Sequence, residues 1–289
     1  MATIKQLRSR IRSAKNIQQI TRAMKLVAAA RLRRAQDRVL EARPYAEEMR
    51  ELMASMAAAG DMPSHPLLER RPIENYGLIL FTAERGLAGS FNTNLIRRAG
   101  DFLKETAGGR KLIGVGKKGA QFFTRRGVEL VDAVTVPTSG PTMEHARAIT
   151  AKAREMFESG EVDAIHLVYS RFHSPIRQIP QVVQLLPIEP PAAAEGAAAE
   201  QFTKTYTFEP DASALLGQLL PRYALTLVLQ ALLESTASEH GARMTAMTSA
   251  TDNAGEMIQD LTLQANRMRQ ASITKEILEI VGGAEALKG

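Results

Sequence analysis

The sequence contains no cysteine and no tryptophan among its 289 residues, and aromatic side chains make up only 5% of them. The lack of cysteine excludes disulfides, thiolate metal sites and thiol switches, and it favours an intracellular chain. Long apolar runs are missing too, because the most apolar stretch, YALTLVLQALL at 223–233, is about half as long as a bilayer-spanning helix. The start, MATIKQLRSRI, lacks the apolar core of a signal peptide. We therefore expect a soluble, intracellular chain with no direct membrane span.

Recognisable catalytic and metal-binding patterns are also lacking. Neither H-E-x-x-H nor G-x-S-x-G occurs, and the histidines show no metal-ligand spacing. The five histidines are His65, His145, His166, His173 and His240. We predict a protein that is not itself an enzyme and that holds no catalytic residue, cofactor or metal of its own.

Basic side chains are concentrated at the N-terminus. Residues 1–59 hold 13 Lys and Arg against 5 Asp and Glu, and the first 34 residues hold ten basic side chains and no acidic one. Such an arm favours an anionic partner, which from the charge alone could be nucleic acid, lipid head groups or a carboxylate-rich protein surface.

Apolar residues in the same arm recur at spacings of three or four, which is typical of a coiled-coil seam. The predicted seam is Ile4, Leu7, Ile11, Ala14, Ile17, Ile20, Met24, Val27, then, after an interruption at Arg31, Ala35, Val39, Ala42, Ala46, Met49, Met53 and Met56. Helix formers fill the intervening positions, and Pro44 is the one break signal. We predict a long helix over residues 1–59 with a kink near Arg43.

A second long helix is predicted over residues 211–289, with a cap at Asp211. Its predicted seam is Leu225, Val228, Leu232, Ser235, Glu239, Ala242, Ala246, Ala250, Asn253, Met257, Leu261, Gln264 and Met268. We expect Gly282 and Gly283 to stop this helix. A long helix at each terminus indicates an antiparallel coiled coil with a domain inserted between the two rods.

Residues 60–210 follow a different pattern. Short β-rich runs at 76–83, 111–116, 128–134, 164–170 and 180–188 alternate with helical patterns at 90–107, 117–126 and 141–159. This alternation predicts a Rossmann-like α/β domain with a mostly parallel sheet, so the fold class is α/β. The Ala-rich stretch 190–200 is interpreted as a loop before the chain returns to the coiled coil.

Two glycine-rich turns in the insert resemble nucleotide-binding loops. In KLIGVGKKGAQFF (111–123), Gly114, Gly116 and Gly119 form a literal G-x-G-x-x-G. We interpret the match as accidental, because the strand runs through Val115 and so places Gly114 inside it. TAERGLAGSFNTNLI (82–96) lacks a phosphate-binding Lys, so its glycines are expected to form a tight turn, with Ser90 or Asn92 capping the next helix.

Three stretches are more specific than these turns. They are QQITRAMKLVAAARLRRAQ (18–36), RGLAGSFNTNL (85–95) and RQASITKEILEIVGGAEAL (269–287), which contains Ile273, Thr274, Glu276, Glu279, Gly283 and Ala284. In this order they closely resemble the γ subunit family of F-type ATP synthases, over essentially the full chain. TAER at 82–85 departs from the family's usual Ser-Asp-Arg.

The resemblance implies a non-catalytic rotor subunit. In that family the terminal helices form a central shaft inside a hexamer of alternating α and β subunits, and the insert lies against the ε subunit and the c-subunit ring. Proton flow turns the ring and shaft and drives ATP synthesis in β, and hydrolysis reverses the motion. ATP binds to other subunits, so no cofactor is implied here. The implied location is peripheral, on the cytoplasmic face of the bacterial inner membrane.

The resemblance also implies contacts with the β subunit. Met24 matches a shaft position near an acidic loop of β, although a seam methionine filling the coiled-coil core would look the same. Arg269 and Gln270 match residues that contact a catch loop of β, and Lys25 could equally be a solvated charge. Thr274 and Glu276 are expected to fix the two helices or the β contact.

Two other functions fit parts of the sequence. A nucleic-acid-binding coiled coil would also carry ten cations, but it would normally add aromatic side chains, and none precedes Tyr45. A nucleotide-sensing α/β protein would bind its ligand at the glycine-rich turn. Neither explains the C-terminal signature, so we expect no nucleic-acid partner.

Overall fold

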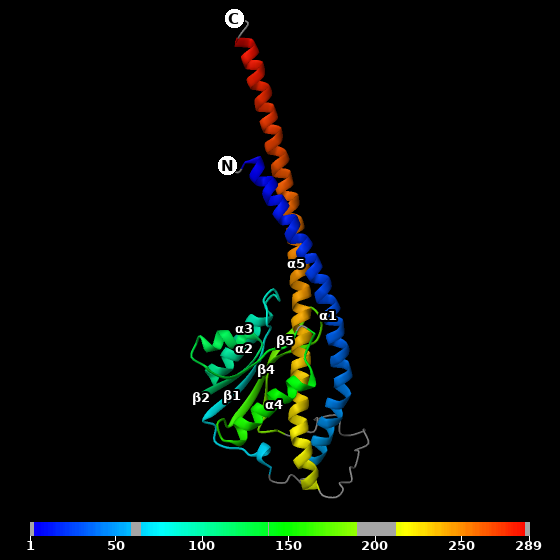
Figure 1. Ribbon diagram of the computed structural model, residues 1–289, viewed down its shortest axis with the longest axis vertical. Helices are drawn as coiled ribbons and strands as arrows, with labels where there is room; N and C mark the ends of the chain where they lie inside the picture. The colour runs from blue at the N-terminus through cyan, green and yellow to red at the C-terminus, as the bar shows by residue number, and fades with distance from the viewer. Residues whose placement is uncertain (1–2, 59–64, 138, 190–211, 287–289) are drawn as a thin grey trace. The chain divides into compact units, whose positions relative to one another are not determined.

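The computed structural model describes residues 3–58, 65–137, 139–189 and 212–286 (Figure 1). The elements are α1 (Ile4–Ala58), η1 (Pro66–Leu68), β1 (Asn75–Phe81), α2 (Phe91–Glu105), β2 (Gly109–Val115), α3 (Lys117–Thr124), β3 (Glu129–Val134), α4 (Met143–Glu158), β4 (Ala164–Phe172), β5 (Gln178–Leu186) and α5 (Ala212–Ala286). All five predicted strands and all three short helices are present. The cap predicted at Asp211 and the loop predicted at 190–200 lie outside the described residues.

The chain divides into two compact units. Residues Met1–Ala28 and Met244–Gly289 form the first, which we call the helical unit, and residues Ala29–Arg243 form the second, the mixed unit. Each contains part of α1 and part of α5. Among the helices described, none has both the length and the apolar character needed to cross a bilayer.

A five-stranded sheet organises the mixed unit, in the order β3-β2-β1-β4-β5. The first four strands are parallel and β5 runs antiparallel to β4. The parallel strands are joined through helices, as the sequence alternation predicts. The predicted Rossmann-like α/β insert is therefore confirmed.

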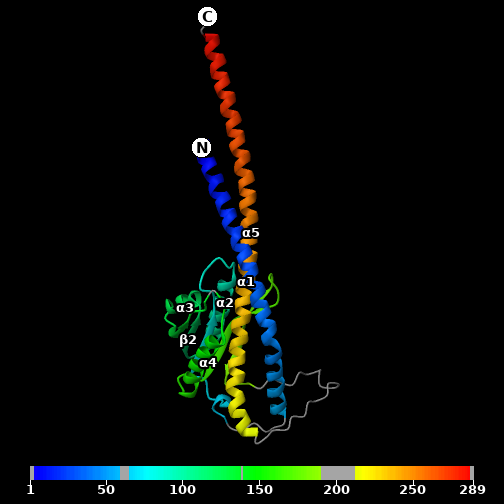
Figure 2. The same cartoon turned by 45° about the vertical axis from the view of Figure 1, so that its right-hand side comes forward.

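Helices cover both faces of this sheet (Figures 1 and 2). On one face, Leu95 and Leu103 of α2 and Phe123 of α3 pack against Leu78 and Leu80 of β1. The other face packs against α4, the later part of α1 and the early part of α5. Because both faces are buried, the central strands read as nearly continuous apolar runs.

Within the mixed unit, α5 has neighbours on more than one side. Its residues between Tyr223 and Gly241 are mostly buried, including polar ones. Ser238 is fully buried, and its hydroxyl donates to the carbonyl of Ser170 on β4 at 3.0 Å. The helix is thus fixed to the sheet by a satisfied polar contact as well as by apolar packing.

In the helical unit, the early part of α1 and the later part of α5 run antiparallel. The helix α1 begins with a capping box, since the Thr3 amide donates to Gln6 Oε1 at 2.8 Å and the Gln6 amide donates to Thr3 Oγ1 at 3.3 Å. The two helices are joined where the Thr251 hydroxyl contacts that of Thr21 at 2.8 Å. The predicted antiparallel pairing is therefore confirmed.

The seam predicted along α1 is wrong at Ile17, Ile20 and Val27, whose side chains are more than half exposed. The buried and half-buried positions instead repeat every seven residues. One row is Leu7, Ala14, Thr21, Ala28, Ala35, Ala42 and Met49, and the other is Ile4, Ile11, Gln18, Lys25, Leu32, Val39, Ala46 and Met53. Small and polar residues fill the middle of both rows, so the bulky apolar side chains there lie outside the seam.

Two expectations for α5 also need correction. Asn253, Met257 and Gln264 are exposed, whereas the less exposed positions include Ala254 and Ile258. Gly282 and Gly283 do not stop the helix, which continues to Ala286. In α1, Pro44 lies inside the helix, which continues to Ala58 as the predicted long helix requires.

Candidate functional site

The G-x-G-x-x-G turn between β2 and α3 is shaped by packing inside the protein. Gly114 lies in β2, where a Cβ would approach Ala120 to 2.7 Å. Gly116 has φ of +86°, and a Cβ there would come within 2.0 Å of the Thr82 carbonyl oxygen. A Cβ on Gly119 would lie 2.7 Å from Leu80. The packing around each of these three positions therefore explains why it is occupied by glycine.

The amides that a phosphate would need are already used at this turn. The Gly119 amide donates to Thr82 Oγ1 at 2.9 Å, and the Lys118 amide donates to the Ala83 carbonyl at 3.2 Å. The Thr82 hydroxyl in turn lies 3.2 Å from the Gly116 carbonyl oxygen. A dinucleotide site leaves the first amides of its helix free for the pyrophosphate. Here Thr82 and Ala83, which follow β1, accept these hydrogen bonds, and this supports the interpretation of the motif as accidental.

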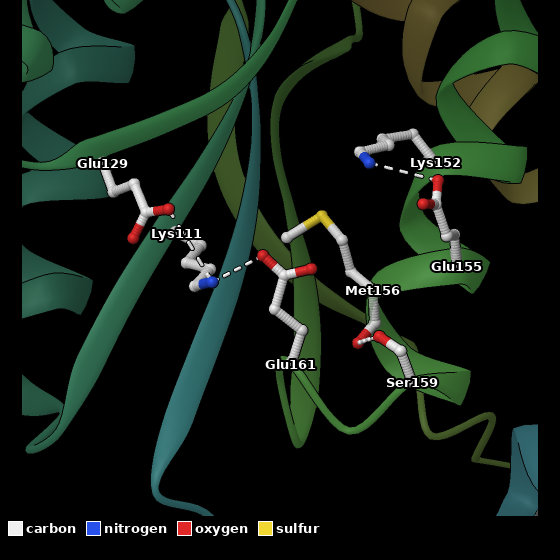
Figure 3. A network of polar contacts seen from close by, with 7 residues as sticks. All are labelled: Lys111, Glu129, Lys152, Glu155, Met156, Ser159 and Glu161. Carbon is white, nitrogen blue, oxygen red and sulfur yellow. Dashed lines mark hydrogen bonds and ion pairs between the residues drawn. The ribbon is translucent and has the colours of Figure 1, made fainter.

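Polar residues at the opposite, amino-terminal ends of the strands form an ion network (Figure 3). Lys111 Nζ lies 2.5 Å from Glu161 Oε1 and 3.7 Å from Glu129 Oε1. The hydrogen bond to Glu161 raises the pKa of Lys111. Because the network joins β2, β3 and the loop before β4, its evident role is to fix the edge of the sheet.

The Arg-Gly-Leu loop between β1 and α2 is held against α5. Arg243 pairs with Glu239 at 2.6 Å and donates through Nη2 to the Gly86 carbonyl at 3.3 Å. At the tip, Leu87 has φ of +63° and is 64% exposed. A left-handed leucine is unfavourable, so the loop maintains a strained conformation that points an apolar side chain outward.

The start of α2 combines both predicted capping residues. Ser90 is the N-cap, as predicted, but its side chain makes no capping hydrogen bond to the helix amides. Asn92 instead accepts a hydrogen bond from the Ala83 amide at 2.9 Å, which ties the two ends of the loop together. Asn92 thus stabilises the turn rather than the helix terminus.

The structure places the predicted β-contact residues in two groups within the helical unit. Met24 and Lys25 are partly buried on α1. Arg269, Gln270, Thr274 and Glu276 are exposed on α5. From the contact of Thr21 with Thr251, Met24 lies opposite about residue 248 on the antiparallel partner, which leaves roughly 30 Å between the groups at about 1.5 Å per residue.

The end of α5 carries a further feature that its seam does not explain. Large apolar side chains there are about half exposed or more: Ile273, Ile277, Leu278, Ile280 and Val281. The only side-chain hydrogen bond described for Glu276 comes from Ser272 of the same helix, at 3.3 Å. On α1, the apolar side chains of Ile17, Ile20, Leu26 and Val27 are also more than half exposed. Strict seven-residue counting from Leu7 would have identified them as lying outside the seam.

The chain is similar to known proteins over its whole length. The family described as ATP synthase matches residues 3–287. An ATP synthase gamma chain from Moorella thermoacetica is 48% identical over 288 residues, and one from Anaeromyxobacter sp. is 48% identical over 295, each with complete coverage of both chains.

Solved structures share the fold at lower identity. A chain of the Euglena gracilis mitochondrial ATP synthase (OSCP/F1/c-ring, rotational state 3) aligns with a TM-score of 0.65 and 20% identity over 98% of this chain and 94% of that one. A chain of the Tetrahymena thermophila central stalk and c-ring structure aligns with a TM-score of 0.60 and 22% identity over 80% and 99%. This chain therefore belongs to the ATP synthase gamma chain family, and it is a non-catalytic subunit of that enzyme.

Proposed function

We propose that this chain is the central rotating shaft of an F-type ATP synthase, which couples proton flow through the membrane sector to ATP synthesis or hydrolysis in a surrounding hexamer. The observation that carries the proposal is the apolar, exposed end of α5, where Ile280 is 71% exposed. Contiguous apolar surface of this kind indicates a covering partner. The partner we propose is the hexamer of α and β subunits.

Apolar side chains suit a shaft that turns inside a sleeve. Burial of apolar surface is non-directional, so the apolar contacts at this end of α5 need no fixed partner as the shaft turns. Where α1 and α5 are paired in the helical unit, the two helices together resist torsion. The ten basic residues of the first 34 supply charge pairs with carboxylates of the hexamer, which form and break as the shaft turns.

The two groups of predicted contact residues have separate roles in this proposal. Met24 and Lys25 face an acidic loop of β, and Arg269 and Gln270 meet a catch loop of β near the end of α5. Exposed Thr274 and Glu276 add polar contacts at the same level. The exposure of the second group supports this assignment, because none of its side chains is needed to bury the seam.

The sheet-containing part of the chain is proposed to contact the ε subunit and the c-subunit ring. Its own polar network and buried core leave it folded without a ligand. We also propose that the chain is peripheral to the membrane, on the cytoplasmic face of a bacterial inner membrane. The bacterial origin of the relatives in the comparison supports this location.

Reconstitution tests the proposal directly. The full chain is mixed with its α and β subunits, and amide hydrogen exchange is compared between the free and assembled protein. We expect residues 269–284 to gain protection on assembly and one chain to join each hexamer. If the chain is incorporated and exchange at these residues is unchanged, a contact between the end of α5 and the hexamer is excluded.

A charge variant tests the catch contact. Arg269→Ala should lower the affinity of the chain for the hexamer about tenfold, since a charged contact of this type is worth about 1.4 kcal/mol or more. Arg267→Ala is the matched control, because Arg267 is also exposed but lies on another face of α5. Equal effects of the two variants would contradict a specific role for Arg269.

A further inference from the structure

An open groove lies at the outer edge of the sheet in the mixed unit, where α3 packs on β2 and β3. Because β3 is the edge strand, no further strand of the described sheet borders the groove on that side. Its volume is about 410 Å³, which is within the range of roughly 300–1,000 Å³ typical of small-molecule sites. We call it the α3–β3 groove.

The floor of the α3–β3 groove is apolar. Ala120 of α3 and Leu130 and Ala133 of β3 line it. In a regular strand, residues three apart face opposite sides of the sheet. Here the pairing of β3 with β2 skips Val131, and this bulge lets both β3 side chains face the groove. Gly114 of β2 adds no side chain that would fill the space.

Two cations stand at the rim of the groove, at the two ends of α3. Lys117 and Arg125 both line the groove, on the helix face that also carries Ala120, Gln121 and Thr124. Both cations are exposed, and no ion pair is described for either of them in the ranges that the structure covers. Unpaired positive charge beside an apolar floor fits a ligand that is anionic at one end and apolar along the rest.

Two other occupants fit the groove less well. A peptide strand that extended the sheet would need free amides on β3, but the Ala133 amide already donates to Asp132 Oδ1 at 2.7 Å. A nucleotide would need amides of α3 for its phosphates, and those of Lys118 and Gly119 are bonded to the segment after β1. An anionic amphiphile needs neither set of amides.

We propose that the α3–β3 groove binds one single-chain anionic amphiphile of the fatty-acid class. Its chain lies on Ala120, Leu130 and Ala133, and its carboxylate lies at the rim formed by Lys117 and Arg125. The volume is near the lower end of the range for such sites, which favours one chain over two. The inference does not rest on the proposed function, because every lining residue belongs to the mixed unit.

NMR on the isolated full chain, with ¹³C-labelled alanine methyl groups, tests the proposal. Sodium decanoate is titrated at concentrations below those at which it forms micelles. We expect a saturable shift of the Ala120 and Ala133 signals, and unchanged signals from Ala99 and Ala146, which are buried elsewhere.

Two control ligands separate the contributions of the head group and the chain. Acetate carries the carboxylate without the chain, and decyltrimethylammonium carries the same chain with the opposite charge. Each should bind about tenfold more weakly than decanoate or less, because each lacks one of the two complementary features.

Two double variants separate the groove from the general positive charge of this surface. Lys117→Gln with Arg125→Gln removes both rim cations and should weaken decanoate binding about tenfold. Lys118→Gln with Arg126→Gln removes the same charge from neighbouring positions that do not line the groove, and should leave binding nearly unchanged. Arg126 instead lies over the ring of Phe122, at 3.6 Å from its centroid.

Ala133→Phe tests the apolar floor while keeping every charge. Because Ala133 is exposed, the larger side chain should fill the groove without disturbing the core, and the Ala120 signal should no longer respond to decanoate. The proposal is overturned if decanoate does not shift Ala120 and Ala133 in the unmodified chain, if the two double variants bind alike, or if decyltrimethylammonium binds as tightly as decanoate.

Discussion

The two units of the chain place their large apolar side chains in opposite ways. In the mixed unit, Ile79, Phe81 and Phe157 are completely enclosed. In the helical unit, the seam contains Ala14, Thr21 and other small or polar residues, while isoleucines face outward. The mixed unit buries the apolar side chains that stabilise it, whereas the helical unit leaves large apolar side chains exposed on its surface. That exposed surface is available to a partner.

The largest expected difference concerns the same substitution in each unit. Ile113→Ala, at a position 2% exposed in β2, should lower the free energy of unfolding by about 2–5 kcal/mol, because it leaves a cavity in the core. Ile280→Ala, on the exposed end of α5, should change it by less than about 0.5 kcal/mol. Urea denaturation of the isolated chain measures both, and similar losses would contradict the comparison.

A second pair of variants tests whether the glycine-rich turn is structural. Gly116→Ala should cost about 3 kcal/mol of unfolding free energy, since it combines a positive φ with a clash against the Thr82 carbonyl. Gly86→Ala, where a Cβ meets nothing within 4 Å, should cost much less. Thermal denaturation with and without ATP or NAD measures the effect. Stabilisation by a nucleotide that Gly116→Ala abolishes would contradict the packing explanation.

A pH titration should reveal the partly buried histidine of β4, His166. Burial lowers the pKa of His166 to about 4, whereas the unfolded value is about 6.5. The unfolded chain therefore binds the proton more tightly, and stability present above pH 6.5 is lost as the pH falls towards 4, by up to about 3 kcal/mol. His166→Phe, beside Phe102 and Tyr76, should flatten this part of the stability curve. An unchanged curve would exclude His166 as the cause.

The smallest expected effect concerns the polar contact inside the seam. Thr251→Val removes the hydroxyl that contacts Thr21 and should weaken the helical unit by about 1 kcal/mol. The double variant Thr21→Val with Thr251→Val should cost less than the sum of the two single variants, because the two hydroxyls share one contact. Amide hydrogen exchange in α1 near Thr21 measures the change in stability of the helical unit. Additive losses would show that the two hydroxyls do not interact.

The fold of the mixed unit was predictable because each local signal agreed with its neighbours. Alternating strands and helices, and the position of Gly114 inside a strand, follow from the fact that this unit buries its own apolar residues. The motif resemblance gave the candidate contacts at Met24 and at Arg269, but no pattern in the sequence predicted the hydrogen bond from Arg243 to the Gly86 carbonyl. That bond depends on tertiary packing between segments that are distant in the sequence.

The seam was predictable only in part, for a physical reason. The predicted seam places bulky apolar residues such as Ile17 and Ile20 against the partner helix, whereas the structure exposes them. When a helix pair binds a second partner on its outside, hydrophobicity alone cannot tell the inner surface from the outer one. The helix end predicted at Gly282 and Gly283 is wrong because glycine lowers helix stability without necessarily ending a helix.

Single-molecule rotation shows whether this chain turns inside the hexamer. The full chain is assembled with its α and β subunits, the hexamer is fixed to a surface, and a bead is attached to the sheet-containing part of the chain. We expect continuous rotation in one direction with ATP, and no directed rotation without it. A bead that stays fixed in hexamers that contain the chain and hydrolyse ATP would contradict the assignment of this chain as the rotating shaft.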